Sequence, residues 1–178
     1  MTEVTNTDAG WLSREDMDAA RERLPILYVD AVPVRVDDQG TVTKVGLLLR
    51  LGEDGQVKRA LVSGRVLYHE RVRSALLRHL EKDLGALALP QLPASPIPFT
   101  VAEYFPSPSE TGLTDDRQHA VALAYLIPVT GECSPRQDAL ELTWLTPEEA
   151  LSPAVSSEFS GGRDSLLRQA LAYAGWGR

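Results

Sequence analysis

The stretch from Gly64 to Gly85, GRVLYHERVRSALLRHLEKDLG, constrains the fold of this chain more than any other. Most of it predicts an amphipathic helix over Glu70–Leu84, because large apolar side chains recur every four residues (Val72, Leu76 and Leu80). Gly85 stands where a C-terminal cap belongs, and Gly64 predicts a turn that leads into the helix. The rest of the chain must therefore supply a surface on which one apolar helix face can pack.

Strands joined by tight turns are predicted before this helix. Their alternating or β-rich segments are Ile26–Val36, Val42–Leu51 and Val57–Leu61. The connecting segments are rich in Asp and Gly, which favours turns and an antiparallel meander. Pro33 predicts that the first strand lies at a sheet edge or contains a bulge, because proline cannot donate to a strand ladder.

Further strands and short helices are predicted on either side of this region. The strands are Phe99–Phe105, His119–Val129, which should be central because it is the most hydrophobic, and Leu140–Leu145. Helices are predicted over Arg14–Arg23, from Thr146-Pro147 onward, and over Asp164–Ala174, with loops at 88–98, 106–118 and 152–162. The class is α+β with a mixed sheet, in a single domain over residues 1–178 with a disordered tail at 1–10.

The composition excludes several classes of partner. The 178 residues carry a net charge of −7, which argues against a nucleic-acid polymer as ligand. No apolar run approaches the ~20 residues of a membrane helix, and the polar N-terminus does not resemble a signal peptide. The single Cys133 allows no intrachain disulfide. We expect a cytoplasmic protein that does not bind membranes.

The spacing of five residues in the central stretch resembles the signature of the Nudix hydrolases: Gly64, Glu70, Arg78, Leu80 and Gly85. Asp83 stands where the last glutamate of the signature belongs, whereas His79 and Lys82 replace two other glutamates. The preceding strand, the long strand at 119–129 and the closing segment Leu140–Leu151 extend the resemblance over about residues 26–151. It implies a Nudix-type α/β/α sandwich with a mixed β-sheet.

In active Nudix enzymes, glutamates at helix positions i, i+3 and i+4 hold Mg²⁺ or Mn²⁺ against a diphosphate. The same positions here carry His79, Lys82 and Asp83, so one carboxylate of three remains. A lysine ammonium ~5 Å from a divalent ion opposes its binding by roughly 6–7 kcal/mol at an effective dielectric of ~20. Imidazole also suits zinc better than magnesium. The substitutions predict that the usual magnesium site is lost.

Four alternatives remain open for these residues. Glu70 and Asp83 could hold one Mg²⁺ or Mn²⁺ with help from a distant carboxylate (Glu103, Asp115 or Asp116). His69, His79 and Asp83 have the ligand types of a zinc site. Lys82 could instead face a phosphate directly and take over part of the metal's electrostatic role. In the simplest case, it pairs with a surface neighbour and contributes little.

The candidate site residues follow from the resemblance. Glu70, Arg78, His79 and Asp83 are the candidate catalytic residues, Glu70 and Asp83 the candidate metal ligands, and Gly64 and Lys82 the candidate ligand-binding residues. Glu70 and Arg78 are expected to pair and orient the loop on the helix. The large aromatic residues are expected to pack in the core or at an interface, and Tyr104 and Phe105 are the candidates for stacking on a nucleotide base.

Two functions are predicted from this pattern. The first is a Nudix-fold protein with a degenerate metal site that binds a nucleotide or another phosphorylated small ligand with little or no hydrolysis. The alternative is a divergent Nudix hydrolase that uses a divalent metal to cleave a nucleoside diphosphate linked to another moiety. The resemblance also implies a possible homodimer.

Overall fold

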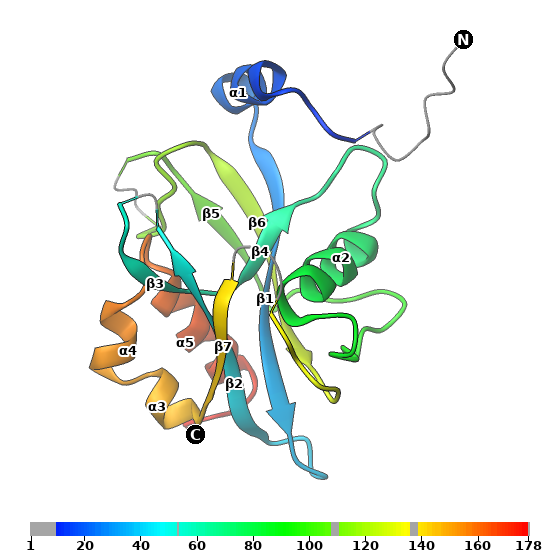
Figure 1. Ribbon diagram of the computed structural model, residues 1–178, viewed down its shortest axis with the longest axis vertical. Coiled ribbons are helices and arrows are strands. Elements are labelled where there is room, and N and C mark those ends of the chain that lie inside the picture. Colours follow the sequence, from blue (N-terminus) through cyan, green and yellow to red (C-terminus); the bar gives the residue numbers. More distant parts are fainter. Residues whose placement is uncertain (1–9, 53, 108–110, 136–138, 178) are drawn as a thin grey trace.

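The computed structural model describes residues 10–52, 54–107, 111–135 and 139–177. Its strands are β1 (Ile26–Val36), β2 (Val42–Leu51), β3 (Val57–Ala60), β4 (Val62–Arg65), β5 (Thr100–Tyr104), β6 (Ala120–Pro128) and β7 (Ala139–Leu145). Its helices are α1 (Arg14–Arg23), α2 (Val72–Leu84), α3 (Pro147–Ala150), α4 (Pro153–Ser157) and α5 (Arg163–Tyr173). Figure 1 shows their arrangement around one sheet.

The described strands form a mixed sheet in the order β3-β2-β1-β6-β5, with β4 also paired to β1 and β7 to β2. β1 and β6 run parallel from the pair Ile26–Ala120 to the pair Val34–Pro128. The pairs β1–β2 and β2–β3 are antiparallel, which confirms the predicted meander. β6 lies between β1 and β5, so the prediction of a central strand over residues 119–129 is also confirmed.

Helices cover both faces of the sheet (Figure 1). On one face, α2 buries a stripe of apolar side chains against β1, β2, β4 and β6 (Ala75, Leu76, Leu80 and Leu84). On the other face, α5 buries Leu166, Leu167, Ala170 and Leu171 in a second core cluster, which also contains Ala150 of α3. The predicted α/β/α sandwich with a mixed sheet is confirmed.

Of the two alternatives predicted from Pro33, the edge strand is wrong, because β1 lies in the middle of the sheet. The register with β2 does shift nearby, between Arg35 and Val36. On one side of β1, pairing with β4 ends at Ala31 and pairing with β2 begins at Val34. Pro33 lies in the gap between these two ladders, where no antiparallel partner strand is paired with it. The missing N–H of a proline is therefore tolerated inside a central strand.

The predicted glycine turn is also wrong, because Gly64 lies in the extended strand β4, where it pairs with Val29. Val57–Leu61 is shorter than predicted, since β3 ends at Ala60. The loop predicted at 152–162 contains the short helix α4, which Ser152 caps. Helix α2 begins at Val72 rather than Glu70, and Gly85 caps it as expected with a φ of 93°. The tail predicted at 1–10 lies almost entirely outside the described residues.

Within the described ranges, none of the helices combines the length and the apolar character that crossing a membrane would require. Cys133 is half-buried, and this burial raises the pKa of its thiol.

Leu80 is fully buried between α2 and the sheet, so we expect Leu80→Ala to lower the free energy of unfolding by about 2–5 kcal/mol. Leu77 lies on the same helix with 39% of its surface exposed, and Leu77→Ala is the matched control, with an expected change of about 0.5 kcal/mol. Urea unfolding measures both. Equal losses would contradict the packing of this helix face.

Candidate functional site

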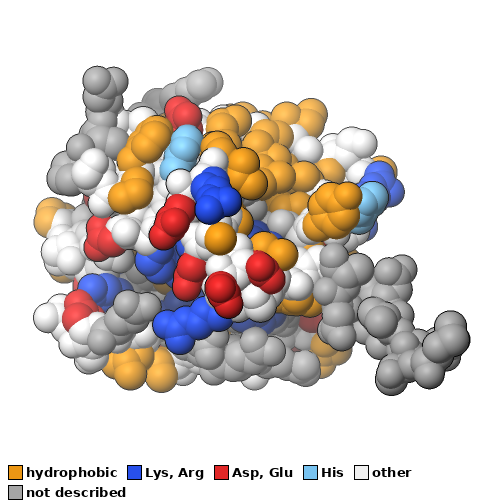
Figure 2. All heavy atoms as spheres, turned by 90° about the horizontal axis from the view of Figure 1, so that it is seen from above, with side chains coloured by type: hydrophobic (Ala, Val, Ile, Leu, Met, Phe, Trp, Pro, Cys, Tyr) orange, Lys and Arg blue, Asp and Glu red, His pale blue; other side chains and the backbone are white. Residues whose placement is uncertain are grey.

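A cavity of about 530 Å³ lies where α2, β2–β4 and the start of α5 meet. The described residues that line it include eight with cationic side chains and no Asp or Glu: Arg50, Lys58, Arg59, Arg65, Arg78, Lys82, Arg117 and Arg163. We call it the basic cavity. Acidic side chains occur on the surface seen from above (Figure 2), and the whole chain has a charge of −7. The positive lining is thus a local feature of this site.

Carboxylates outside the cavity lining pair with five of these cations. The shortest distances are 2.6 Å for Lys58–Asp54 and Arg59–Glu158, 2.7 Å for Arg50–Asp83, 2.8 Å for Arg78–Glu70 and 3.0 Å for Arg117–Asp115. Arg65, Lys82 and Arg163 have no carboxylate partner in the part of the chain that the structure describes. Arg65 and Lys82 thus carry positive charge without an ion-pair partner among the described residues, and Arg163 acts on the buried Asp30 without a direct ion pair. This charge favours an anionic ligand.

Glu70 and Arg78 form the pair that the sequence predicts. Arg78 donates from Nε and Nη2 to the two carboxylate oxygens of Glu70, each at 2.8 Å. The hydrogen bond from Arg78 is the largest cause that lowers the pKa of Glu70, which also accepts the backbone N–H of Leu67 at 2.9 Å. Arg78 also donates to the carbonyl of Arg65 at 3.0 Å. The pair fastens the loop before α2 to the helix.

His79 is buried against β4 instead of pointing into solvent. Its Nε2 lies 3.0 Å from the carbonyl oxygen of Arg65, so this nitrogen carries the proton and donates it. Burial is the main cause that lowers the pKa of His79, so the ring is neutral at pH 7. A Cβ on Gly64 would overlap the imidazole ring. Position 64 therefore needs a glycine because the histidine approaches it so closely, and not because the backbone turns.

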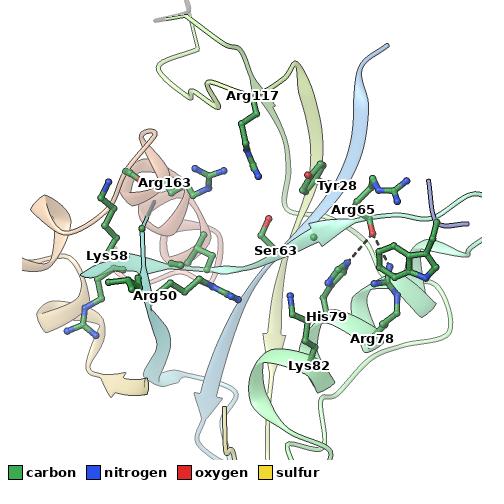
Figure 3. Close-up of a pocket in the computed structure, with 18 residues that line it drawn as sticks. Tyr28, Arg50, Lys58, Ser63, Arg65, Arg78, His79, Lys82, Arg117 and Arg163 are labelled. Atoms are coloured by element: carbon green, nitrogen blue, oxygen red, sulfur yellow. Dashed lines mark hydrogen bonds between the residues drawn. The ribbon is translucent and has the colours of Figure 1, made fainter. Parts of the chain in front are cut away.

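Asp83 is fully buried, and Arg50 Nη2 lies 2.7 Å from its Oδ2. Neither carboxylate oxygen receives a well-aligned hydrogen bond from a described residue, so the ion pair is its main compensation. Arg50 comes from β2, on the other side of the cavity from α2 (Figure 3). The last carboxylate of the signature is therefore occupied by an arginine of the same chain.

Lys82 is half-buried and lines the cavity on the α2 side, next to His79 (Figure 3). It forms no ion pair with a described residue. The simplest alternative, a surface ion pair, is therefore not what the structure contains. A lysine in this position is suited to contact an anion directly.

Asp30 and Ser63 form a second polar group at the cavity, which the sequence analysis missed. Asp30 is 2% exposed and accepts hydrogen bonds from Ser63 Oγ at 2.6 Å and from Tyr104 OH at 2.8 Å. Ser63 lines the cavity, between Arg163 and Arg117 on one side and Lys82 and His79 on the other (Figure 3). A charged residue within a buried apolar strand was the signal available in the sequence.

The donors present do not fit a magnesium ion. Glu70 is held by Arg78, Asp83 by Arg50, and Lys82 adds a positive charge. Among the described residues, no three His, Cys, Asp or Glu side chains come together as a metal site. His69, Glu103, Asp115 and Asp116 therefore do not complete one with the residues of α2. A metal-binding role for Glu70 and Asp83 stays a prediction, and their contacts argue against it.

The aromatic candidates for base stacking lie elsewhere. Tyr104 is 2% exposed, and its hydrogen bond goes to Asp30. Phe105 stacks on His119, with 4.5 Å between ring centroids. The aromatic side chain that does line the cavity and is exposed is Trp11, whose ring lies 5.8 Å from the guanidinium of Arg65 and 5.6 Å from that of Arg78. Trp11 was expected to pack in the core or at an interface, and its exposure of 58% contradicts the first of these alternatives.

Comparison with known proteins identifies the family. The family model described as "Domain of unknown function (DUF4916)" matches residues 7–176. The chain belongs to this family. A crystal structure from Jonesia denitrificans, described as a possible asymmetric diadenosine tetraphosphate (Ap4A) hydrolase, is 67% identical with a TM-score of 0.84. The alignment covers 86% of this chain and 96% of that one. No curated protein matches.

Two more distant structures show the fold alone. The MutT NUDIX hydrolase from Burkholderia pseudomallei is 19% identical with a TM-score of 0.58, and 83% of this chain and 98% of that chain are covered. The NUDIX domain of Shewanella oneidensis NrtR, solved with ADP ribose, is 18% identical with a TM-score of 0.60, and 89% and 97% are covered. The Nudix-type fold that the sequence resemblance implies is thus confirmed.

We expect Gly64→Ala to destabilise the protein by about 1–3 kcal/mol, because the added methyl group overlaps the His79 ring. The double variant Gly64→Ala with His79→Ala should recover part of this loss, since the overlapping ring is gone. Thermal and urea unfolding of the two single variants and the double variant form a double-mutant cycle. Strictly additive losses would contradict the close contact between residues 64 and 79.

Addition of Mg²⁺ or Mn²⁺ alone should leave the melting temperature unchanged, since the α2 flank offers the ion an ion-paired aspartate and a lysine. His79→Glu combined with Lys82→Glu restores the family's carboxylate spacing and should produce stabilisation by Mg²⁺. His79→Gln with Lys82→Gln is the neutral control of equal size. Stabilisation of the unmodified protein by either ion would contradict this assessment of the site.

Proposed function

We propose that this Nudix-fold protein binds a nucleotide or another phosphorylated small molecule in the basic cavity, with its own cations in place of a divalent metal. The observation that carries the proposal is the lining of eight Lys and Arg residues without an Asp or Glu among the described residues. A phosphate group is recognised by guanidinium and ammonium donors of this kind. The arginine partners of Glu70 and Asp83 support binding with little or no hydrolysis.

The cations converge on the cavity from three separate parts of the fold. Lys82 comes from α2, Arg50 from β2 and Arg163 from the start of α5. The ring of Tyr104 lies 4.5 Å below the Arg163 guanidinium, which restrains this side chain in front of the cavity. Positive groups on opposite walls suit a ligand with more than one anionic group, such as a diphosphate.

A second candidate is hydrolysis of a nucleoside polyphosphate. It is favoured by the protein from Jonesia denitrificans, which is 67% identical and is described as a possible asymmetric Ap4A hydrolase. In this chain Glu70 and Asp83 would have to exchange their arginine partners for a metal ion. The two candidates differ in one respect that can be measured, the requirement for a divalent ion.

We expect ATP, diadenosine tetraphosphate or pyrophosphate to raise the melting temperature in the presence of EDTA. A ligand at 100 times its dissociation constant stabilises the native state by about 2.7 kcal/mol. Lys82→Ala and Arg163→Ala should each weaken binding about tenfold or more, because a hydrogen bond to a charged group contributes about 1.5–3 kcal/mol. Arg168→Ala is the control, since this α5 arginine is exposed and pairs with Asp164 away from the cavity.

The same samples, assayed for release of phosphate compounds, distinguish a hydrolase from a protein that only binds the ligand. Release of phosphate compounds that requires Mg²⁺ or Mn²⁺, with no metal-free thermal shift, would favour the second candidate over the first. If Arg168→Ala weakened ligand binding as much as Arg163→Ala, binding in the basic cavity would be contradicted.

A further inference from the structure

The Asp30 carboxylate is buried in an arrangement that fits its ionised form. Ser63 Oγ donates to Oδ1 at 2.6 Å, and Tyr104 OH donates to Oδ2 at 2.8 Å. Both partners are hydroxyl groups, and an ionised carboxylate can accept a hydrogen bond at each of its oxygens. The protein thus holds an acceptor of protons, 2% exposed, directly behind the cavity wall.

The fold places the serine between this carboxylate and the cavity. Asp30 of β1 and Ser63 of β4 are paired residues of an antiparallel ladder, so their side chains project from the same face. Asp30 does not line the cavity, whereas Ser63 does. Because the hydroxyl hydrogen points to Asp30, the lone pairs of Ser63 Oγ are available to a bound ligand.

The three residues have the geometry of an activated nucleophile. Such a group needs a base within about 2.6–3.2 Å and a third residue that orients the base. Asp30 is at 2.6 Å from Ser63 Oγ, and Tyr104 orients its other oxygen. Burial is the main cause that raises the pKa of Asp30, which makes it a stronger base than an exposed aspartate.

We propose that Ser63 and Asp30 are a nucleophile–base pair that takes a phosphoryl group from a phosphoanhydride bound in the basic cavity. The inference rests on the proposed function, since the phosphoanhydride must first bind there. A bond forms between Ser63 Oγ and the phosphorus atom, and the bond from phosphorus to the bridging oxygen breaks. The bridging oxygen leaves with the electron pair, and the serine proton passes to Asp30. The product is phosphoserine at position 63.

The cations around Ser63 supply the electrostatic part of this step. Phosphoryl transfer depends mainly on positioning and on positive charge near the transferred group and the leaving oxygen. Lys82 and Arg163 line the cavity on opposite sides of Ser63 (Figure 3), and neither pairs with a described carboxylate. An aspartate that accepts a hydroxyl proton performs the same task in protein kinases.

The experiment incubates the full chain with ATP, diadenosine tetraphosphate or pyrophosphate in EDTA, followed by an acid quench and intact-mass measurement. We expect one added phosphoryl group, located at Ser63 by peptide mapping. Ser63→Ala should abolish the addition, whereas Ser157→Ala, a change of an exposed serine of α4 that does not line the cavity, should retain it. Asp30→Asn should slow it by about 100-fold or more, the usual range for loss of a general base.

Tyr104→Phe tests the positioning residue. It leaves the base and the nucleophile in place and removes one hydrogen bond to Asp30. We expect slower phosphorylation with an unchanged thermal shift by the same ligands, which a purely structural role for the hydrogen bond would not produce. Melting curves without ligand check that each variant is folded.

Three results would overturn the inference. A thermal shift without any phosphoserine would refute phosphoryl transfer and leave the proposed binding function intact. Phosphorylation at another residue, or in the Ser63→Ala variant, would refute the role of Ser63. No thermal shift and no phosphoserine would refute both the inference and the proposed function.

Discussion

The contact between Gly64 and the His79 ring sets the distance between α2 and the sheet, and the candidate site depends on it. The absence of a side chain at position 64 lets the imidazole reach the carbonyl of Arg65 in the same strand. With α2 held at this distance, Arg78 reaches both Glu70 and the Arg65 carbonyl. Lys82, one turn further along, then lines the cavity, and Asp83 pairs with Arg50 outside the lining. The contact between a glycine and a neutral histidine thus determines where the charged side chains of α2 lie.

Two arginines account for the carboxylates that remain in the Nudix signature. Arg78 binds Glu70 from within the helix, and Arg50 reaches Asp83 from β2. Asp83 is fully buried, so removal of Arg50 would leave an uncompensated charge at a cost of about 3–5 kcal/mol. Arg50 therefore stabilises the fold as well as lining the cavity. A metal ion at Asp83 would have to replace a partner on which the folded state depends.

The sequence predicted the fold well because its signals are local. The apolar stripe of α2, the start of α3 after Thr146 and the turns of the β1–β3 meander each follow from neighbouring residues. The edge strand predicted from Pro33 was wrong because the gap between two partner strands on one side of β1 depends on the whole sheet and not on neighbouring residues. The ion pair between Arg50 and Asp83 and the hydrogen bond between Tyr104 and Asp30 join distant segments. No spacing in the sequence indicates these contacts, so the sequence could not predict this part of the site.

Arg163 shows that the site extends beyond the segment that resembles the Nudix fold. That segment ends near residue 151, but Ser160 and Arg163 line the cavity. Helix α5 packs on the sheet face opposite α2, and its first residue reaches the cavity beside Tyr104. The charge on Arg163 also opposes the rise in the pKa of Asp30 that burial causes. Arg163 thus both lines the cavity and acts on the buried carboxylate behind Ser63. The C-terminal helix therefore supplies a positive group in a site where the α2 helix has lost most of its carboxylates.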